Sequence, residues 1–211
     1  MTKEEAYIKH KKKNIIRLVN KYNKRASHDN SFQINENNLD LENTFCNPKR
    51  CKGCGECCQK FSCVFSPGDF LNITDLDYMR NILNSGIVCI SSTSHGTLIL
   101  RPRRKKDDKQ IVSITTDSYS CLLHSSHGCL LPAAYRPSEG LLYYPSKYGH
   151  IVMYEDEQTE DEYAEYQNIL WELFHEYNDQ VIPIDIIEDE SGFVHCTEED
   201  ARSLAKRLAG Y

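Results

Sequence analysis

The feature that most constrains this chain is a run of four cysteines within eight residues. Cys51, Cys54 and Cys57 follow one another at intervals of three residues, and Cys58 comes directly after Cys57. Two intervening residues form a tight turn in which both sulfur atoms point at one centre, and the glycines between these cysteines give the backbone the freedom that such a turn needs. The run therefore predicts a metal site.

A chain of 211 residues is long enough to bury a stable core without disulfide bonds. No apolar stretch of signal-peptide length follows Met1, and no apolar run approaches about 18 residues, so we expect a cytoplasmic protein that does not enter a membrane. In a reducing cytosol, clustered thiols hold metal or carry out redox chemistry rather than form disulfides. We expect residues 1–45 to form a basic helix and linker, and residues 46–211 to form a cysteine-cluster domain with C-terminal helices.

The charge of the chain is unevenly distributed, although its net value is -6. The first 25 residues are strongly basic, with Glu4 and Glu5 as their only acidic residues, whereas the part after Ile151 is acidic. A nucleic-acid site is not favoured, because no aromatic or polar base-reading residues accompany the lysines. The N-terminal helix either packs on its own domain or is a candidate surface for a protein partner. The sequence leaves the oligomeric state open.

Local patterns predict an α+β fold: a small single domain with helices around a short β-hairpin or sheet and a cysteine-rich metal-binding core. Capping residues and apolar spacing predict helices at residues 2–25, 75–84, 160–177 and 197–210, with Thr2, Thr74 and Thr197 at their starts. Two β-rich stretches, residues 97–103 and 110–116, are predicted to pair as a hairpin, with the charged run 104–109 as its exposed connection.

A second cysteine pair, Cys121 and Cys129, follows this hairpin and brackets a polar loop. Together with Cys51 and Cys54, this pair is sufficient for a tetrahedral zinc site. Adjacent cysteines are poor ligands for one small ion, since neighbouring side chains project in different directions. Cys57 and Cys58 are therefore expected to serve two centres, or one centre and a redox role. The predicted ligand set is Cys51, Cys54, Cys57, Cys58, Cys63, Cys121 and Cys129.

The alternative to Zn²⁺ is an iron–sulfur cluster, because soft thiolate ligands favour both. The first three cysteines of the run match a bacterial ferredoxin pattern, but Phe61 stands where the fourth cysteine belongs. A cluster of another topology remains open, with Cys63, Cys121 or Cys129 as the remote ligand.

Other residues near these cysteines have less specific patterns. Whether Cys46, His124 or His127 also ligates is left open by the sequence. Arg136, held by the proline that follows it, is a candidate hydrogen-bond donor to a ligating sulfur. We assign structural roles to the two remaining thiols, Cys89 within an apolar stretch and Cys196 at a predicted helix start.

These motifs resemble the YkgJ-type cysteine-cluster family, which is described as a zinc- or iron-chelating CxxCxxCC domain. The resemblance spans about residues 51–145 and rests on the cysteine run, the Cys121-Leu-Leu and Gly-Cys129 segments, and the pair Arg136-Pro137. It implies a ligand role for every cysteine of the run, for Cys121 and for Cys129. The family pattern has a further cysteine where this chain has Gly140, and Cys63 is the candidate to replace it.

The sequence thus predicts a protein that holds a zinc ion or an iron–sulfur cluster in a redox, accessory or binding role. Two alternatives stay open. The resemblance extends to a flagellin lysine N-methylase, which implies a protein-modifying enzyme, although the chain has no glycine-rich cofactor loop. The other alternative is a structural zinc module that presents the basic helix to a partner.

Overall fold

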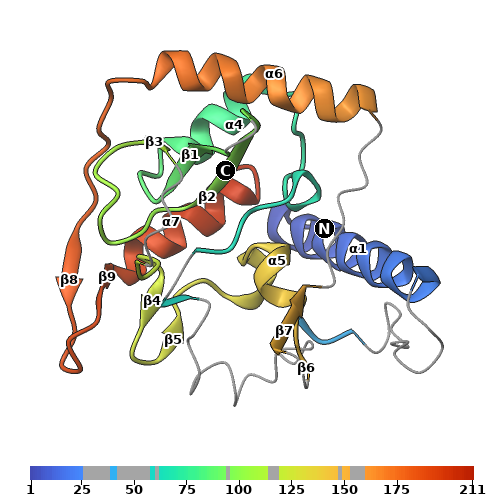
Figure 1. Cartoon of the computed structure of the whole chain (residues 1–211), viewed down its shortest axis with the longest axis horizontal. Helices are drawn as coiled ribbons and strands as arrows, with labels where there is room; N and C mark the ends of the chain where they lie inside the picture. The colour runs from blue at the N-terminus through green and yellow to red at the C-terminus, as the bar shows by residue number, and fades with distance from the viewer. Residues whose placement is uncertain are drawn as a thin grey trace.

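The structure is a computed structural model that describes residues 1–25, 39–41, 58–59, 62–93, 96–113, 119–146, 149–152 and 160–211. Its elements are helices around small sheets, and Figure 1 shows α6 along one edge of the molecule and α1 along another. The α+β class predicted from the sequence is therefore confirmed. Cys46, Cys51, Cys54 and Cys57 lie outside the described residues. Within the described part, no helix is long and apolar enough to cross a membrane.

The N-terminal helix α1 (Lys3–Arg25) begins as predicted. The amide of Glu5 donates to the hydroxyl of Thr2 at 3.1 Å, and the amide of Thr2 donates back to the Glu5 carboxylate at 2.8 Å. This reciprocal capping box satisfies two amides that a helix start leaves without partners. The buried side chains of α1 recur at helical spacing and include Tyr7, Ile15 and Val19. The apolar side of the helix therefore packs on the rest of the chain.

A three-stranded sheet lies near the middle of the molecule, and it corrects the predicted hairpin (Figure 1). Strand β1 (Val88–Ser92) is central; it pairs antiparallel with β2 (Leu98–Pro102) and parallel with β3 (Ile111–Ser113). The two predicted stretches therefore each pair with β1 and not with each other. The first three residues of β1 are fully buried, so this strand lacks the alternation of apolar and polar residues that marks a strand in a sequence.

The charged run between β2 and β3 is partly buried, which corrects its prediction as an exposed connection. Arg103, Arg104 and Asp107 are each about 5–6% exposed. The Asp107 carboxylate accepts hydrogen bonds at 2.6 Å from Arg101 Nη1 and from the backbone amide of Arg104. Burial of these charges is tolerated because each one is paired or hydrogen-bonded.

The described part of the chain also contains three two-stranded ribbons: β4 (His124–Ser125) with β5 (Gly128–Cys129), β6 (Tyr143–Ser146) with β7 (Gly149–Val152), and β8 (Ile186–Glu188) with β9 (Val194–Cys196). The short helices are η3 (Pro67–Asp69), η4 (Ala133–Tyr135) and α5 (Ser138–Leu141). The ribbon β4–β5 carries the loop between the second cysteine pair.

The remaining helices are α4 (Leu76–Leu83), α6 (Glu160–Glu176) and α7 (Glu198–Leu208), close to the predicted bounds. Thr197 caps α7 as predicted, because its hydroxyl accepts from the amide of Asp200 at 3.1 Å. The cap of α4 is Asp75 rather than Thr74, since the Asp75 carboxylate accepts from the amide of Tyr78 at 3.0 Å. Cap position is a local competition between neighbouring polar side chains, which the sequence pattern alone does not decide.

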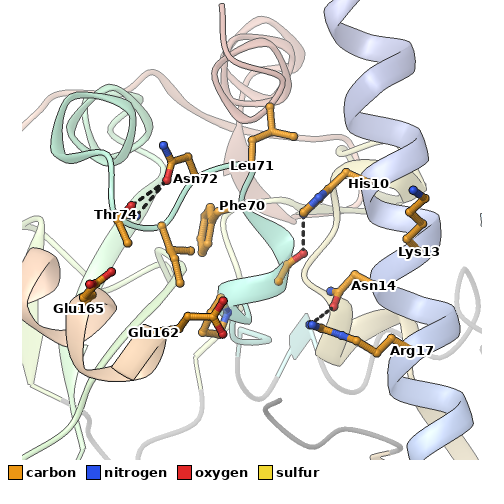
Figure 2. Close-up of a pocket in the computed structure, with 13 residues that line it drawn as sticks. His10, Lys13, Asn14, Arg17, Phe70, Leu71, Asn72, Thr74, Glu162 and Glu165 are labelled. Carbon is orange, nitrogen blue, oxygen red and sulfur yellow. Dashed lines mark hydrogen bonds between the residues drawn. The ribbon is translucent and has the colours of Figure 1, made fainter. Parts of the chain in front are cut away.

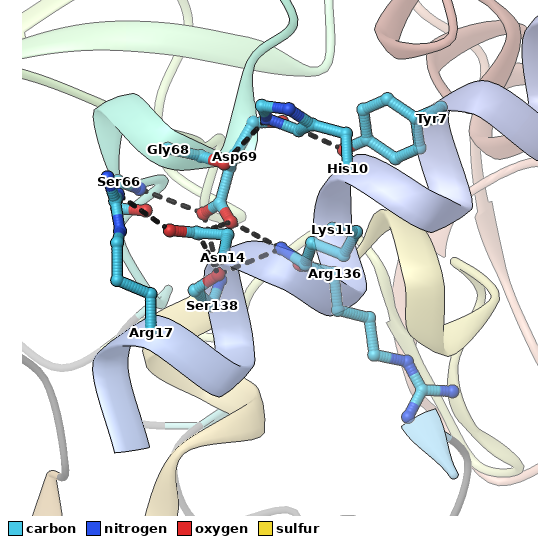
Figure 3. A network of polar contacts seen from close by, with 10 residues as sticks. All are labelled: Tyr7, His10, Lys11, Asn14, Arg17, Ser66, Gly68, Asp69, Arg136 and Ser138. Carbon is cyan, nitrogen blue, oxygen red and sulfur yellow. Dashed lines mark hydrogen bonds and ion pairs between the residues drawn. The ribbon is translucent and has the colours of Figure 1, made fainter. Parts of the chain in front are cut away.

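A buried polar network attaches α1 to η3 and α5 (Figure 3). The Lys11 ammonium and the Asp69 carboxylate are both fully buried and form an ion pair. Lys11 also donates to the backbone oxygen of Arg136 at 2.7 Å and to the hydroxyl of Ser138 at 3.0 Å. Asp69 accepts from the amides of Ser66 and Ser138, both at 2.9 Å. Burial lowers the pKa of Lys11, and the adjacent Asp69 charge opposes this effect.

Neutralising Asp69 therefore tests how α1 is held. In Asp69→Asn the Lys11 ammonium loses its counter-charge in a buried site, so we expect the free energy of unfolding to fall by about 3–5 kcal/mol. Urea denaturation at pH 7 measures this change. The exposed control Asp185→Asn should stay within about 0.5 kcal/mol of the natural chain. Equal stabilities for the two variants would show that the buried pair does not hold the helix.

Candidate metal centre

Four of the seven predicted ligands lie in the described part of the chain: Cys58, Cys63, Cys121 and Cys129. Together with Cys89 and Cys196, they are present as thiols. Cys63 and Cys121 are buried, and Cys58 and Cys129 are half-buried. The other predicted ligands, in the segment that precedes Cys58, are outside the described residues.

Cys58 and Cys121 are neighbours in space although 62 other residues separate them in sequence. The amide of Cys121 donates to the carbonyl oxygen of Cys58 at 2.7 Å. The end of the N-terminal cysteine run therefore lies beside the first cysteine of the second pair, as a shared centre requires.

The ribbon β4–β5 returns Cys129 to the same region. His124 on β4 is directly opposite Cys129 on β5, and the amide of His124 donates to the carbonyl of Cys121 at 3.0 Å. Gly128 has a φ of 103°, a conformation that favours glycine. The backbone of the turn therefore explains why glycine precedes Cys129. The short ribbon thus keeps Cys121 and Cys129 close together.

Cys196 joins these cysteines, which the sequence analysis did not anticipate. Its amide donates to the carbonyl of Leu122 at 2.8 Å, and its side chain is fully buried. Burial raises the pKa of Cys196 to about 12, with further contributions from the Asp200 carboxylate and from Cys129. No spacing pattern in the sequence connects Cys196 with the other cysteines, because β9 brings it there through tertiary pairing.

The electrostatics of Cys121 indicate that these thiols share one neighbourhood. Burial raises its pKa well above the ordinary value, and Cys58, Cys129 and Cys196 raise it further. A second negative charge nearby disfavours ionisation of a thiol. The raised pKa values of Cys121 and Cys196 disfavour their thiolates, so ionising these thiols side by side requires a compensating cation.

A compensating side chain that the sequence analysis did not identify is Arg101, which has Cys121 among its electrostatic neighbours. Burial alone would lower the pKa of Arg101, but Cys89, Asp107 and Cys121 together raise it. Its Nη1 also lies 3.5 Å from the hydroxyl of Ser62, the residue before Cys63. Its Nη2 is buried and has no hydrogen-bond partner among the described residues. Arg136, by contrast, donates from Nε to the carbonyl of Leu131 at 2.8 Å.

Cys63 lies beside Gly140, the position where the resembled family has a cysteine. A Cβ built at Gly140 would be 3.1 Å from Cys63 Sγ and 3.5 Å from Cys63 Cβ. The sulfur of Cys63 therefore occupies the space next to that position, and the small size of glycine at 140 leaves room for it. The neighbouring Glu139 carboxylate accepts from the amide of Val64, which holds this segment in place.

The two histidines of the loop differ in their surroundings. His124 is buried, and its ring packs edge-on against Phe193 with ring centres 5.2 Å apart. Burial lowers the pKa of His124, and His195 lowers it further. Its Nδ1 is buried without a hydrogen-bond partner in the described part of the chain. His127 is exposed. Of the two, His124 has the neutral, unpaired ring nitrogen that a ligand needs.

The described residues do not form a complete metal site by themselves. Among them, no set of three or more His, Cys, Asp or Glu side chains is grouped closely enough to hold a metal ion. Cys51, Cys54 and Cys57 belong to the remainder of the chain and are not covered by that statement. Comparisons of the chain with protein-family models, curated proteins and solved structures find no match.

The Arg101–Asp107 pair beside this site predicts a dependence of stability on pH. Burial raises the pKa of Asp107, but bonding to Arg101 and Arg104 outweighs it, so the net pKa is lowered. A lowered carboxyl pKa stabilises the folded chain above the unfolded pKa of about 3.9, and this stabilisation is lost as the pH falls through the folded value. We expect Asp107→Asn to be less stable than the natural chain at pH 7, and the difference to narrow below about pH 4.

Urea denaturation at a series of pH values from neutral to acidic measures this difference. The exposed neighbour Asp108→Asn is the control and should follow the natural chain throughout. A stability difference for Asp107→Asn that stays constant across the series would exclude the pair as its source.

Proposed function

We propose that this chain holds a zinc ion or an iron–sulfur cluster through cysteines that come from separate segments. The observation that carries the proposal is the contact of Cys58 with Cys121, with Cys129 and Cys196 close by. Cys58 is the last residue of the CxxCxxCC run, and it lies beside the first cysteine of the second pair. The ligands would be Cys58, Cys121 and Cys129, together with Cys51, Cys54 and Cys57; Cys63 and Cys196 are the further candidates.

The donor chemistry supports this assignment. Buried thiols are soft ligands once deprotonated, and they suit zinc and iron–sulfur clusters rather than magnesium or calcium. A bound cation would also remove the cost of ionising thiols that raise one another's pKa. When bound, zinc would brace the segments that meet at Cys121, and a cluster would add transfer of an electron.

Arg101 supplies a second argument from charge. A centre with four thiolates carries a net charge near minus two, which needs compensation in a buried site. The Arg101 guanidinium is 4% exposed, has Cys121 among its electrostatic neighbours and keeps buried Nη2 hydrogens without partners among the described residues. Buried donors of this kind are costly unless they are used, and sulfur atoms of a charged centre are suitable acceptors. The role of Arg101 is therefore to offset charge and orient ligands.

Removal of single thiols tests the ligand set. Cys121→Ala and Cys58→Ala should each weaken metal binding by more than the 10–100-fold expected for loss of an outer-shell partner. Cys89→Ala is the control, since Cys89 is a buried thiol on β1 that does not belong to the candidate ligand set. Elemental analysis and visible absorption after oxygen-free purification measure the bound metal. If the natural chain binds no metal after reconstitution with zinc or with iron and sulfide, the proposal is contradicted.

Transfer of the thiol from position 63 to position 140 tests whether Cys63 replaces the family ligand. We expect Cys63→Ala to lose metal and the double variant Cys63→Ala, Gly140→Cys to recover it, because the two side chains would occupy adjoining space. The matched control is Cys63→Ala with Gly140→Ser, which restores bulk without a thiol. Full metal binding by Cys63→Ala, or recovery by the serine control, would exclude a ligand role for Cys63.

A further inference from the structure

A pocket of about 490 Å³ lies between α1 and the first turns of α6, and the segment from Pro67 to Thr74 forms the wall between them (Figure 2). This volume is within the range of pockets that bind small molecules, about 300–1,000 Å³. Among the described residues, none of the side chains that line the pocket is a cysteine, so the described part of the candidate metal centre does not contribute to it.

The pocket carries opposite charges on its two helices. Lys13 and Arg17 line it from α1, and Glu162 and Glu165 line it from α6, as Figure 2 shows. Lys13 and Glu165 are exposed, and neither makes a hydrogen bond or ion pair with a described residue. One basic and one acidic group are therefore available to a ligand from opposite walls.

The segment between the helices gives the pocket apolar surface from Leu71, which is 38% exposed, and from the half-buried Ile73, alongside the polar Asn72 and Thr74. Phe70 is 2% exposed, and its ring packs against Tyr166 of α6 with ring centres 6.4 Å apart. An apolar surface between two charged walls suits a ligand whose own charges are separated by an apolar portion.

His10 adds a polar group with a defined protonation state. Its Nε2 lies 3.0 Å from the carbonyl oxygen of Gly68 and must donate to it, because a carbonyl only accepts. Burial lowers the pKa of His10, and the nearby Lys11 and Arg17 charges lower it further. The hydrogen bond to Gly68 and the Asp69 charge raise it, but the net pKa is lowered. The ring is therefore neutral at pH 7, and its Nδ1 is an acceptor.

The pocket is held open by the buried network described above. Gly68 approaches α1 so closely that a Cβ there would lie 2.3 Å from the side-chain oxygen of Asn14. A larger residue at position 68 would displace the Asn14 side chain, so glycine allows the η3 segment to lie directly against the helix. The next residue, Asp69, forms the buried ion pair with Lys11. The α1 wall and the apolar wall are thus fixed relative to each other before any ligand binds.

We infer that this pocket binds a short peptide with free ends, with its carboxylate beside Lys13, its ammonium beside Glu165, and an apolar side chain against Leu71 and Ile73. This class of ligand follows from the two charged walls of the pocket, the apolar surface between them and the volume of the pocket. A ligand with only one charge would leave either Lys13 or Glu165 without a partner.

The test is titration of the full chain with the tripeptide Ala-Leu-Ala, its N-acetylated form and its C-amidated form, followed by NMR of backbone amides. Capping removes one terminal charge in each case. The free tripeptide should shift the amides of Gly68 and Phe70, and Lys13→Ala and Glu165→Ala should each weaken its binding about fivefold. The matched controls Lys9→Ala and Glu172→Ala, exposed on the same helices but outside the pocket, should leave it unchanged.

The capped peptides identify which end meets which wall. The N-acetylated form should bind more weakly and lose its dependence on Glu165 while it keeps its dependence on Lys13; the amidated form should do the reverse. Equal binding of all three peptides, binding that neither variant changes, or no shift of pocket amides at millimolar peptide would overturn the inference. None of these results bears on metal content, so the two proposals fail separately.

Discussion

The backbone of residues 121–123 forms hydrogen bonds with three segments that are far apart in the sequence. Cysteines take part in two of the contacts at this junction. The amide of Cys121 bonds to Cys58, the amide of Leu122 bonds to the carbonyl of Arg103 at 2.9 Å, and the carbonyl of Leu122 accepts from Cys196. Because Leu122 is fully buried, none of these partners can be exchanged for water without loss. The junction therefore forces several thiols into one buried region, and the surrounding charges must accommodate them.

Two buried ion pairs give the interior its polar organisation. Arg101 with Asp107 lies on the sheet side of the junction, and Lys11 with Asp69 lies between α1 and η3. Each pair is expensive to desolvate and is supported by further hydrogen bonds, which is the condition under which such pairs persist. The first pair leaves a guanidinium beside Cys121, while the second fixes the wall of the pocket. The metal centre and the pocket that we propose are therefore each supported by one of them.

Features set by local chemistry could be predicted from the sequence. Thr2 with Glu5 and Thr197 with Asp200 identify helix starts, because a cap involves residues only three positions apart. The apolar spacing of α6 is likewise a property of the helix itself. Pairing between strands was not predictable in this way: β2 and β3 both have strand-like sequences, but their common partner β1 is buried without alternation. The burial of Asp107 follows from partners that the sequence does not identify.

The residues of the candidate site also fall into two groups: those that sequence motifs identified and those that only tertiary packing identifies. The spacing of the cysteine run and of the second pair identified the candidate ligands, and of the run the structure places Cys58 beside Cys121. Cys196 and Arg101 were missed because they reach the site through β9 and β2, by tertiary packing and not by a motif. Gly140 was recognised only as a departure from a family pattern, and its meaning depends on the position of Cys63 in space.

X-ray absorption spectroscopy at the zinc and iron edges, on the full chain prepared without oxygen, tests the central claim most directly. It reports the number and type of atoms bound to the metal. The account predicts a first shell made mainly of sulfur, at about 2.3 Å if the metal is zinc. A first shell of oxygen and nitrogen, or no bound metal in the protein, would contradict it.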